Sequence, residues 1–294
     1  ICCLLWNYLM LLGFVLRNRK SCFIYLTYGN SIDLPFMYIV SLAGKSIIDI
    51  HEAIAQNVDD NADLKRRFKK IYSERIKSVI VHSQRTNDLL DEYGYGGVRL
   101  FVPHFKYCFS KKYDIRRVGA DIVSSVAEDK VNILFFGNIT YDKGVDILIS
   151  AVNMLEPKLR SKANIIIAGK DFDGTVYRVH PLDKAAFKII LRHIGDDELV
   201  YLYKHTDYVA LPYRKTSQSG ILEMAFYFRK PMLTEFPSFG ILSDKDVPAY
   251  AATLASVIGQ HSSAAYFLDE DYFRYTNRIE IKVFKQQFDA WIKR

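Results

Sequence analysis

Short apolar segments alternate along this chain with segments of helical character, and this alternation restricts the folds that are possible. Residues 78–83 (SVIVHS), 131–137 (VNILFFG) and 163–169 (ANIIIAG) are almost continuously apolar. Strands of this kind must be covered on both faces, as happens in parallel sheets with helices on either side. The sequence therefore predicts an α/β protein, whose ligands should bind at the carboxyl ends of the strands.

The same alternation extends over most of the chain. The strands that we expect are 21–29, 46–53, 78–83, 98–104, 131–137, 163–169, 207–213 and 230–235. The helices that we expect are 1–16, 31–44, 59–76, 84–93, 143–155, 183–192, 196–205, 219–228 and 278–293.

The length indicates two domains, because 294 residues exceed the ~250 at which single cores stop growing. The alternation fails in the polar stretch before residue 131, which indicates a linker there. We expect a first domain at 1–112, a linker at 113–130, a second domain at 131–272, and a final helix at 273–294 that returns toward the first domain.

The charge of the chain favours a polyanionic partner. The formal net charge is +7, with basic clusters at 17–20, 65–70 and 116–117. Anionic lipid headgroups, nucleic acid or a phosphorylated small molecule would suit this balance, although 65–70 equally suits a solvated helix face. The aromatic residues follow strand and helix periodicity and form no stacking platform, so we expect no nucleic-acid partner.

The first sixteen residues (ICCLLWNYLMLLGFVL) are almost wholly apolar. A bilayer-spanning helix needs ~20 such residues, so we expect a buried or membrane-surface helix rather than an anchor. The four cysteines, Cys2, Cys3, Cys22 and Cys108, have no metal-like spacing, and we expect them to be reduced, buried and cytosolic.

Two strand-to-helix loops have the composition of an anion site. Gly137 ends a strand and Lys143 opens a helix, so a close backbone approach, a helix N-terminus and a positive charge coincide, as a phosphate or diphosphate requires. The second loop leads into a helix at Ser219 and Gly220. A tight turn and a plain serine N-cap are the structural alternatives.

Two further positions extend this site. Gly169 is a third small strand end, so three such ends in one sheet indicate a nucleotide-sized ligand. Glu223 lies one turn inside the second helix, where its carboxylate either accepts hydrogen bonds from a ribose diol or favours the helix dipole.

In this order and spacing, these stretches resemble the retaining glycosyltransferases of family 4 (group 1), which have the GT-B fold. The similarity rests on FFGNITYDKGVDILISA, IIIAGK, TDYVALPYRKTSQSGILEMAFYFRKPML, DIHEA, VHSQRTNDLL and VRLFVPH. It implies two Rossmann-like domains facing a cleft, with a UDP- or GDP-linked sugar held mainly by the second and the acceptor mainly by the first. It also implies transfer without metal or other cofactor.

The resemblance assigns roles to particular residues. Lys143 matches a lysine on the donor diphosphate, and Glu223 matches the last glutamate of an E-x7-E motif that binds the ribose. His51 matches a histidine that faces the donor sugar near the reaction centre. The backbone amides at the diphosphate are those of Ser219, Gly220 and Ile221.

The chain also departs from the family pattern. Asn138 stands where an arginine commonly follows the glycine, and Lys215 stands where the first glutamate would be. A replacement cation is expected from Arg214 or Lys215. The family's first strand and glycine-rich loop have no counterpart here, so we expect an incomplete, N-terminally truncated first domain, which leaves the activity of this fragment open.

The implied function is transfer of a hexose from a nucleotide sugar to a glycan or lipid-linked acceptor, as in polysaccharide biosynthesis. The expected location is the cytoplasm, with peripheral contact to an anionic inner membrane face. Asn138 and Lys215 keep a second interpretation open, a non-catalytic nucleotide- or carbohydrate-binding homologue or partner subunit.

Overall fold

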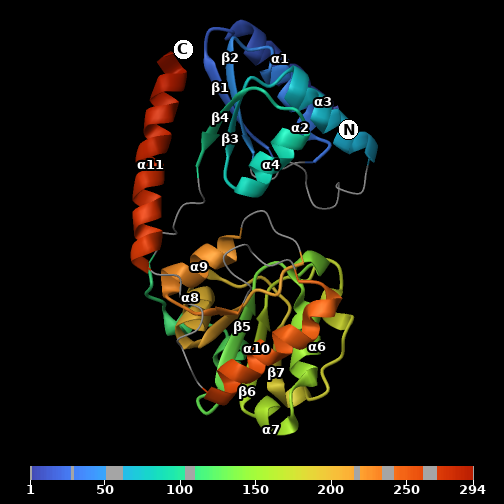
Figure 1. The fold of residues 1–294 in the computed structure, drawn as a ribbon, viewed down its shortest axis with the longest axis vertical. Coiled ribbons are helices and arrows are strands. Elements are labelled where there is room, and N and C mark those ends of the chain that lie inside the picture. Colours follow the sequence, from blue (N-terminus) through green and yellow to red (C-terminus); the bar gives the residue numbers. More distant parts are fainter. Residues whose placement is uncertain are drawn as a thin grey trace. The chain divides into compact units, whose positions relative to one another are not determined.

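The structure is a computed structural model, and it describes residues 2–27, 30–50, 62–102, 110–214, 219–233, 242–260 and 270–293. The chain forms two compact units (Figure 1). The first consists of Ile1–His104 with Arg274–Arg294, and the second of Phe105–Phe273. Both are α/β units with parallel sheets, as the sequence predicts.

In its described part, the first unit has a parallel sheet whose four strands follow chain order, β1-β2-β3-β4. These strands are β1 (Cys22–Thr27), β2 (Lys45–Ile50), β3 (Ser78–Val81) and β4 (Val98–Phe101). The helices are α1 (Cys2–Arg17), α2 (Asp33–Val40), α3 (Ala62–Glu74) and α4 (Gln84–Glu92). One core of this unit joins the sheet to α2, α3 and α4 through Met37, Ile48, Phe68, Val79 and Leu90.

The last helix, α11 (Glu270–Lys293), contributes to a second core of the first unit. Trp291 is buried there with Ile47, Ile80, Leu100 and Val102. Its indole Nε1 donates a hydrogen bond of 2.8 Å to the Ser78 hydroxyl, so its polar atom is satisfied inside the core.

The helix α1 is only partly covered. Val15 is buried, and the Tyr8 ring lies 4.4 Å from the Phe36 ring, between centroids. The side chains of Leu5, Trp6, Leu9, Met10 and Phe14 are between 55% and 63% exposed. None of the helices in the described ranges has both the length and the apolar character that crossing a bilayer requires.

The cysteine prediction is partly wrong. Cys3 and Cys22 are free, and their side chains are exposed rather than buried. Cys22 begins β1, which lies at an edge of the described sheet, and this position leaves its side chain accessible.

The second unit has a parallel sheet with the strand order β7-β6-β5-β8-β9 among its described residues. These strands are β5 (Val131–Phe136), β6 (Ala163–Ala168), β7 (Phe187–Ile190), β8 (Tyr208–Ala210) and β9 (Met232–Leu233). The helices are α5 (Ala120–Val123), α6 (Val145–Met154), α7 (Pro157–Arg160), α8 (Asp196–His205), α9 (Gly220–Phe228) and α10 (Val247–Gln260).

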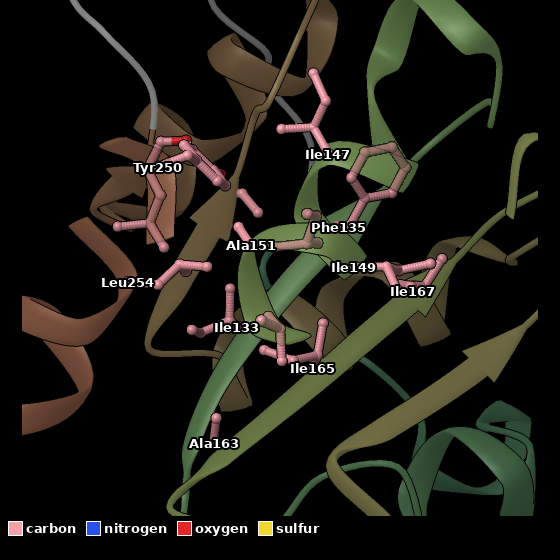
Figure 2. Packing of buried hydrophobic residues seen from close by; sticks show 14 of the residues in the cluster. Ile133, Phe135, Ile147, Ile149, Ala151, Ala163, Ile165, Ile167, Tyr250 and Leu254 are labelled. Atoms are coloured by element: carbon pink, nitrogen blue, oxygen red, sulfur yellow. The ribbon is translucent and has the colours of Figure 1, made fainter. Parts of the chain in front are cut away.

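Both faces of this sheet are buried, because alternate residues of β5 and β6 enter different cores. On one face Ile133, Phe135, Ile165 and Ile167 pack with residues of α6 and α10 (Figure 2). On the other face Leu134, Ile166 and Ala168 pack with residues of α8 and α9. Because both faces are buried, the sequences of these strands are almost continuously apolar.

Residues 113–130, which the sequence predicts to be a linker, instead belong to the second unit. They contain a 3-10 helix, Ile115–Arg117, and α5. Val118 and Ile122 are buried in the core beside α8 and α9. Glu198 of α8 accepts a hydrogen bond of 3.1 Å from the Gly119 amide, so this polar stretch is attached to the unit.

The prediction of a helix at 183–192 is wrong. The segment forms a 3-10 helix, Lys184–Ala186, and the edge strand β7. Phe187 and Ile190 are buried, whereas Lys188 and Ile189 are exposed. The spacing of the apolar residues suits a helix, but pairing with the open edge of β6 and the β-branched Ile189 and Ile190 favour a strand.

Candidate functional site

The strand order of the second unit defines where a ligand can bind. The chain runs outward from β5 through β6 to β7, and then returns to the other side of β5 with β8 and β9. The connections that follow β5 and β8 therefore lead in opposite directions along the sheet. In sheets of this kind, ligands bind at this topological switch point. The candidate residues Gly137, Asn138 and Lys143 lie in the connection after β5, and Arg214 lies shortly after β8. Ser219, Gly220, Ile221 and Glu223 lie at the N-cap or in the first turn of α9.

Gly137 and Gly169 bring the ends of β5 and β6 into close contact. Both have positive φ angles, 112° and 149°. A Cβ atom on Gly169 would lie 1.9 Å from the Gly137 carbonyl oxygen, and one on Gly137 would lie 3.0 Å from Cδ1 of Ile221 in α9. Both positions therefore require glycine, and the close contacts join two strand ends to the first turn of α9.

Gly144 joins the loop after β5 to the loop after β8. It is the N-cap of α6, its φ is 68°, and a Cβ there would lie 1.9 Å from the Pro212 carbonyl oxygen. The preceding residue, Lys143, ends the 3-10 helix Tyr141–Lys143. Its Nζ lies 4.2 Å from the centroid of the Tyr213 ring, a cation–π arrangement.

Tyr213 connects Lys143 to the N-terminus of α9. Its hydroxyl lies 3.1 Å from the Ser219 Oγ, and both side chains are buried. Burial raises the pKa of Tyr213 to about 12, although the hydrogen bond with Ser219 opposes this shift. The phenol therefore stays neutral at physiological pH and is a fixed apolar support for the lysine.

Ser219 is the N-cap of α9, and its Oγ accepts a hydrogen bond of 3.3 Å from the Leu222 amide. The backbone N–H groups of Gly220 and Ile221 lie in the first turn, where a helix offers no intrahelical acceptor. The capping role that the sequence allowed is therefore present, and the same geometry is the one that favours an anion at a helix N-terminus.

Glu223 also lies in the first turn of α9, and its side chain is 6% exposed. Its amide donates a hydrogen bond of 3.3 Å to the Ser219 carbonyl. Glu223 is thus a mostly buried acid close to the helix N-terminus, where the helix dipole stabilises its charge.

Arg214, an expected replacement cation, is engaged by two carboxylates. Nη1 and Nη2 donate to the two oxygens of Asp146 at 2.7 and 2.8 Å, and Nη2 also donates to Asp244 at 2.6 Å. Burial lowers the pKa of Arg214, but the hydrogen bonds that it donates to Asp146 and Asp244 outweigh this effect and raise the pKa above its usual range. The remaining donor, Nε–H, is buried and has no hydrogen-bond partner within the described residues.

The other predicted residues are placed as follows. Asn138 is exposed, directly after Gly137. His51 and Lys215 lie outside the described residues. In the part of the chain that is described, no three His, Cys, Asp or Glu side chains come together as metal ligands would.

Sequence reasoning missed Tyr213 and Asp146. A tyrosine directly before a polar loop, and an aspartate in the first turn of the helix after Gly144, were the available signals. Neither signal distinguishes a site residue from an ordinary buried ring or an ordinary helix-end acid.

Part of the chain matches a known protein family. Residues 121–229 match the model of the Glycosyl transferases group 1, and this segment contains both loops of the site. It amounts to less than half of the chain.

A curated relative is the uncharacterized glycosyltransferase MJ1607 of Methanocaldococcus jannaschii, which is 31% identical over 126 residues. This match covers 40% of the present chain and spans only 29% of the length of the relative.

Several solved structures share the fold. HepE of Anabaena in complex with UDP gives a TM-score of 0.68 at 15% identity, and the match covers 97% of this chain and 82% of HepE. The E. coli trehalose-6-phosphate structure bound with UDP-2-fluoro glucose gives 0.62 at 10% identity, covering 99% and 76%. The lipopolysaccharide-biosynthesis glycosyltransferase WaaG gives 0.52 at 14% identity, covering 74% and 71%. The chain therefore has the GT-B fold, and residues 121–229 of its second unit match the glycosyl transferases of group 1.

Proposed function

We propose that this chain is, or is part of, a glycosyltransferase that moves a sugar from a nucleotide-sugar donor to an acceptor. The observation that carries the proposal is the contact between the loops after β5 and β8, which places Lys143 over Tyr213 beside the N-cap of α9. Two helix N-termini and a lysine at a topological switch point suit a diphosphate. The group 1 match over residues 121–229 supports the same ligand class.

The donor that we propose is linked to UDP or GDP, with UDP favoured by the ligands of the structural relatives. HepE has been crystallised with UDP and with UDP-glucose. In this proposal Glu223 binds the ribose, and the backbone of Gly137, Asn138 and Gly169 borders the nucleotide. No metal or other cofactor takes part.

The proposed chemistry is cleavage of the bond between the anomeric carbon and the diphosphate oxygen. The diphosphate leaves with the electron pair, the acceptor oxygen bonds to the anomeric carbon, and the proton of the acceptor hydroxyl passes to an oxygen of the leaving diphosphate. Negative charge develops on the leaving diphosphate, where Lys143 and the first turn of α9 would stabilise it. The proposal includes retention of configuration and a role for His51 near the donor sugar, both of which are what the family resemblance implies.

The proposed acceptor is a glycan or a lipid-linked glycan, and the proposed location is the cytoplasm, on the inner face of the plasma membrane. The exposed apolar side chains of α1 and the basic residues Arg17, Arg19 and Lys20 support contact with an anionic surface. Sedimentation with liposomes tests this part of the proposal. Equal binding to neutral and anionic vesicles, or no binding, would contradict it.

A substitution of Lys143 tests the donor site. We expect Lys143→Met to weaken UDP or GDP binding in titration calorimetry by about 1.5–3 kcal/mol, the usual loss for a charge-assisted hydrogen bond. Lys158, which is exposed on α7, is the matched control, and Lys158→Met should leave affinity unchanged. Unchanged affinity in Lys143→Met would remove the basis of the proposal. If Glu223→Ala leaves affinity unchanged, only the ribose role is wrong.

The second candidate is a nucleotide or carbohydrate binder without turnover. The engagement of Arg214 by Asp146 and Asp244 favours it, because the expected replacement cation is already paired. Donor hydrolysis and transfer assays separate the two candidates, since a binder gives heat in calorimetry but no product.

A further inference from the structure

Arg214 joins three segments at the carboxyl end of the second sheet. It follows β8, its Nη1 donates to the Tyr141 carbonyl at 2.9 Å, and its backbone amide donates to the Asp142 carbonyl at 2.8 Å. Asp146 lies in the first turn of α6, and Asp244 begins the 3-10 helix Asp244–Asp246. The loop that carries Lys143 is therefore fixed to the segment after β8 through the guanidinium and the backbone amide of Arg214.

The ion pair between Arg214 and Asp146 is largely shielded from water. The side chains are 10% and 9% exposed, and both oxygens of Asp146 accept from the guanidinium. A bidentate, shielded pair of this kind is strongly oriented. The Tyr141 ring packs on the guanidinium, with 4.0 Å between Cζ and the ring centroid, and fixes its plane.

The position of Asp146 has an electrostatic consequence. Asp146 lies three residues after Lys143, in the first turn of α6, whose N-terminus borders the proposed diphosphate site. A carboxylate at a helix N-terminus occupies the positive end of the helix dipole and repels a second anion there. Without Arg214 this buried charge would lack its guanidinium partner.

We propose that Arg214 is a positioning residue that neutralises Asp146 and holds the two loops together, so that the anion site accepts a diphosphate. This inference rests on the proposed function. Arg214 acts through Asp146 and not by touching the nucleotide. The positive charge offered to the diphosphate is that of Lys143 and the helix N-termini.

A double-mutant cycle tests the inference. Wild type, Arg214→Met, Asp146→Asn and the double variant are titrated with UDP, or with GDP if that binds better, by calorimetry. The corresponding nucleoside, which has no phosphate, is titrated by ligand-observed NMR. Lys230→Met is the control, because Lys230 joins two segments near the opposite end of the sheet by donating to the Lys204 and Thr206 carbonyls.

We expect Arg214→Met to weaken diphosphate binding about tenfold, as the unneutralised negative charge of Asp146 near the diphosphate site would do. Binding of the nucleoside should stay within about twofold, and the double variant should recover most of the loss. Asp146→Asn alone should bind UDP at least as tightly as wild type, which keeps the test informative if Arg214→Met folds poorly.

Several outcomes would overturn the inference. A double variant as weak as Arg214→Met would indicate direct contact between Arg214 and the phosphate, for example through Nε–H. Equal loss for nucleotide and nucleoside, or an equal loss in Lys230→Met, would indicate a general structural role. If the wild-type protein binds neither UDP nor GDP, the proposed function itself is wrong. If the wild-type protein binds but the double variant does not regain affinity, only the role of Arg214 is wrong.

Discussion

Tyr213 is the residue that connects the two loops of the candidate site. It supports Lys143 with its ring and the N-cap Ser219 with its hydroxyl. Tyr213→Phe removes only the hydroxyl, so we expect a loss of about 0.5–1.5 kcal/mol in unfolding free energy and nearly unchanged UDP binding. Tyr213→Leu also removes the ring, so it should weaken UDP binding as well. Urea unfolding and calorimetry on both variants separate these roles, and equal UDP affinity in the two would contradict the role of the ring.

The raised pKa of Tyr213 predicts a pH dependence of stability. The folded value is about 12, against 10 for an unperturbed tyrosine. Between these values the unfolded chain releases this proton and the folded chain retains it, so stability decreases as the pH rises. The decrease attributable to Tyr213 should reach about 2–3 kcal/mol, at 1.36 kcal/mol per pKa unit.

Tyr213→Phe lacks this ionisation and is the control for it. It should be less stable than wild type at pH 9 and more stable than wild type near pH 12. Urea unfolding at a series of pH values measures this reversal, and a constant difference between the two proteins would contradict it.

The sequence predicts site residues whose role depends on their immediate neighbours in the chain. It misses residues whose contacts are with partners far away in the sequence. Lys143, Ser219 and the glycines are recognisable because a strand end followed by a helix N-terminus is a local pattern. The two carboxylates that pair with Arg214 lie 68 and 30 residues away in the sequence, so only the folded sheet reveals that its charge is already paired.

Among the connecting elements, the turn into α6 depends on a glycine for two separate reasons. Gly144 has a left-handed backbone, and an added Cβ would also lie 1.9 Å from the Pro212 carbonyl. Gly174 has a similar φ of 73°, but nothing lies within 4 Å of an added Cβ. Gly174→Ala should therefore cost about 1 kcal/mol, the strain of the left-handed region alone.

Gly144→Ala should cost more than Gly174→Ala, because backbone must also move. It should weaken UDP binding too, since the displaced loop carries Lys143. Thermal unfolding and UDP titration of the two alanine variants measure both effects. Equal losses in the two variants would contradict the close contact with Pro212.

The elements themselves were largely predictable where apolar residues are continuous or the ends are capped. The strands β5 and β6 and the helix α9 are recognisable in the sequence for these reasons. The edge strand β7 is not, because only one of its edges has a partner in the described sheet and its apolar spacing also suits a helix. Pairing with β6 decides its conformation, and that interaction is tertiary.

The chain contains two tryptophans, one buried and one exposed. Both belong to the first unit, so substituting them tests whether that unit unfolds independently. Trp291 is 6% exposed in the core with β2, β3 and β4, whereas Trp6 on α1 is 63% exposed. Trp291→Ala should destabilise the first unit by about 3–5 kcal/mol, as large core truncations do. Trp6→Ala should change stability by about 0.5 kcal/mol or less.

Hydrogen exchange resolved by segment measures this difference. In Trp291→Ala the amides of β3 and β4 should exchange faster, while those of β5 and β6 keep their protection. Faster exchange in both units would show that they unfold together, which would contradict the division into two units.

The return of α11 to the first unit also determines the order in which the chain can fold during its synthesis. All of Phe105–Phe273 leaves the ribosome before Trp291 does. The whole second unit can therefore fold while the first unit still lacks α11. Until then Ile47, Ile80 and Leu100 lack a core contact that lies more than 190 positions downstream in the sequence. A nascent chain arrested before residue 274 should hold a protease-resistant second unit beside a first unit that remains a substrate for chaperones.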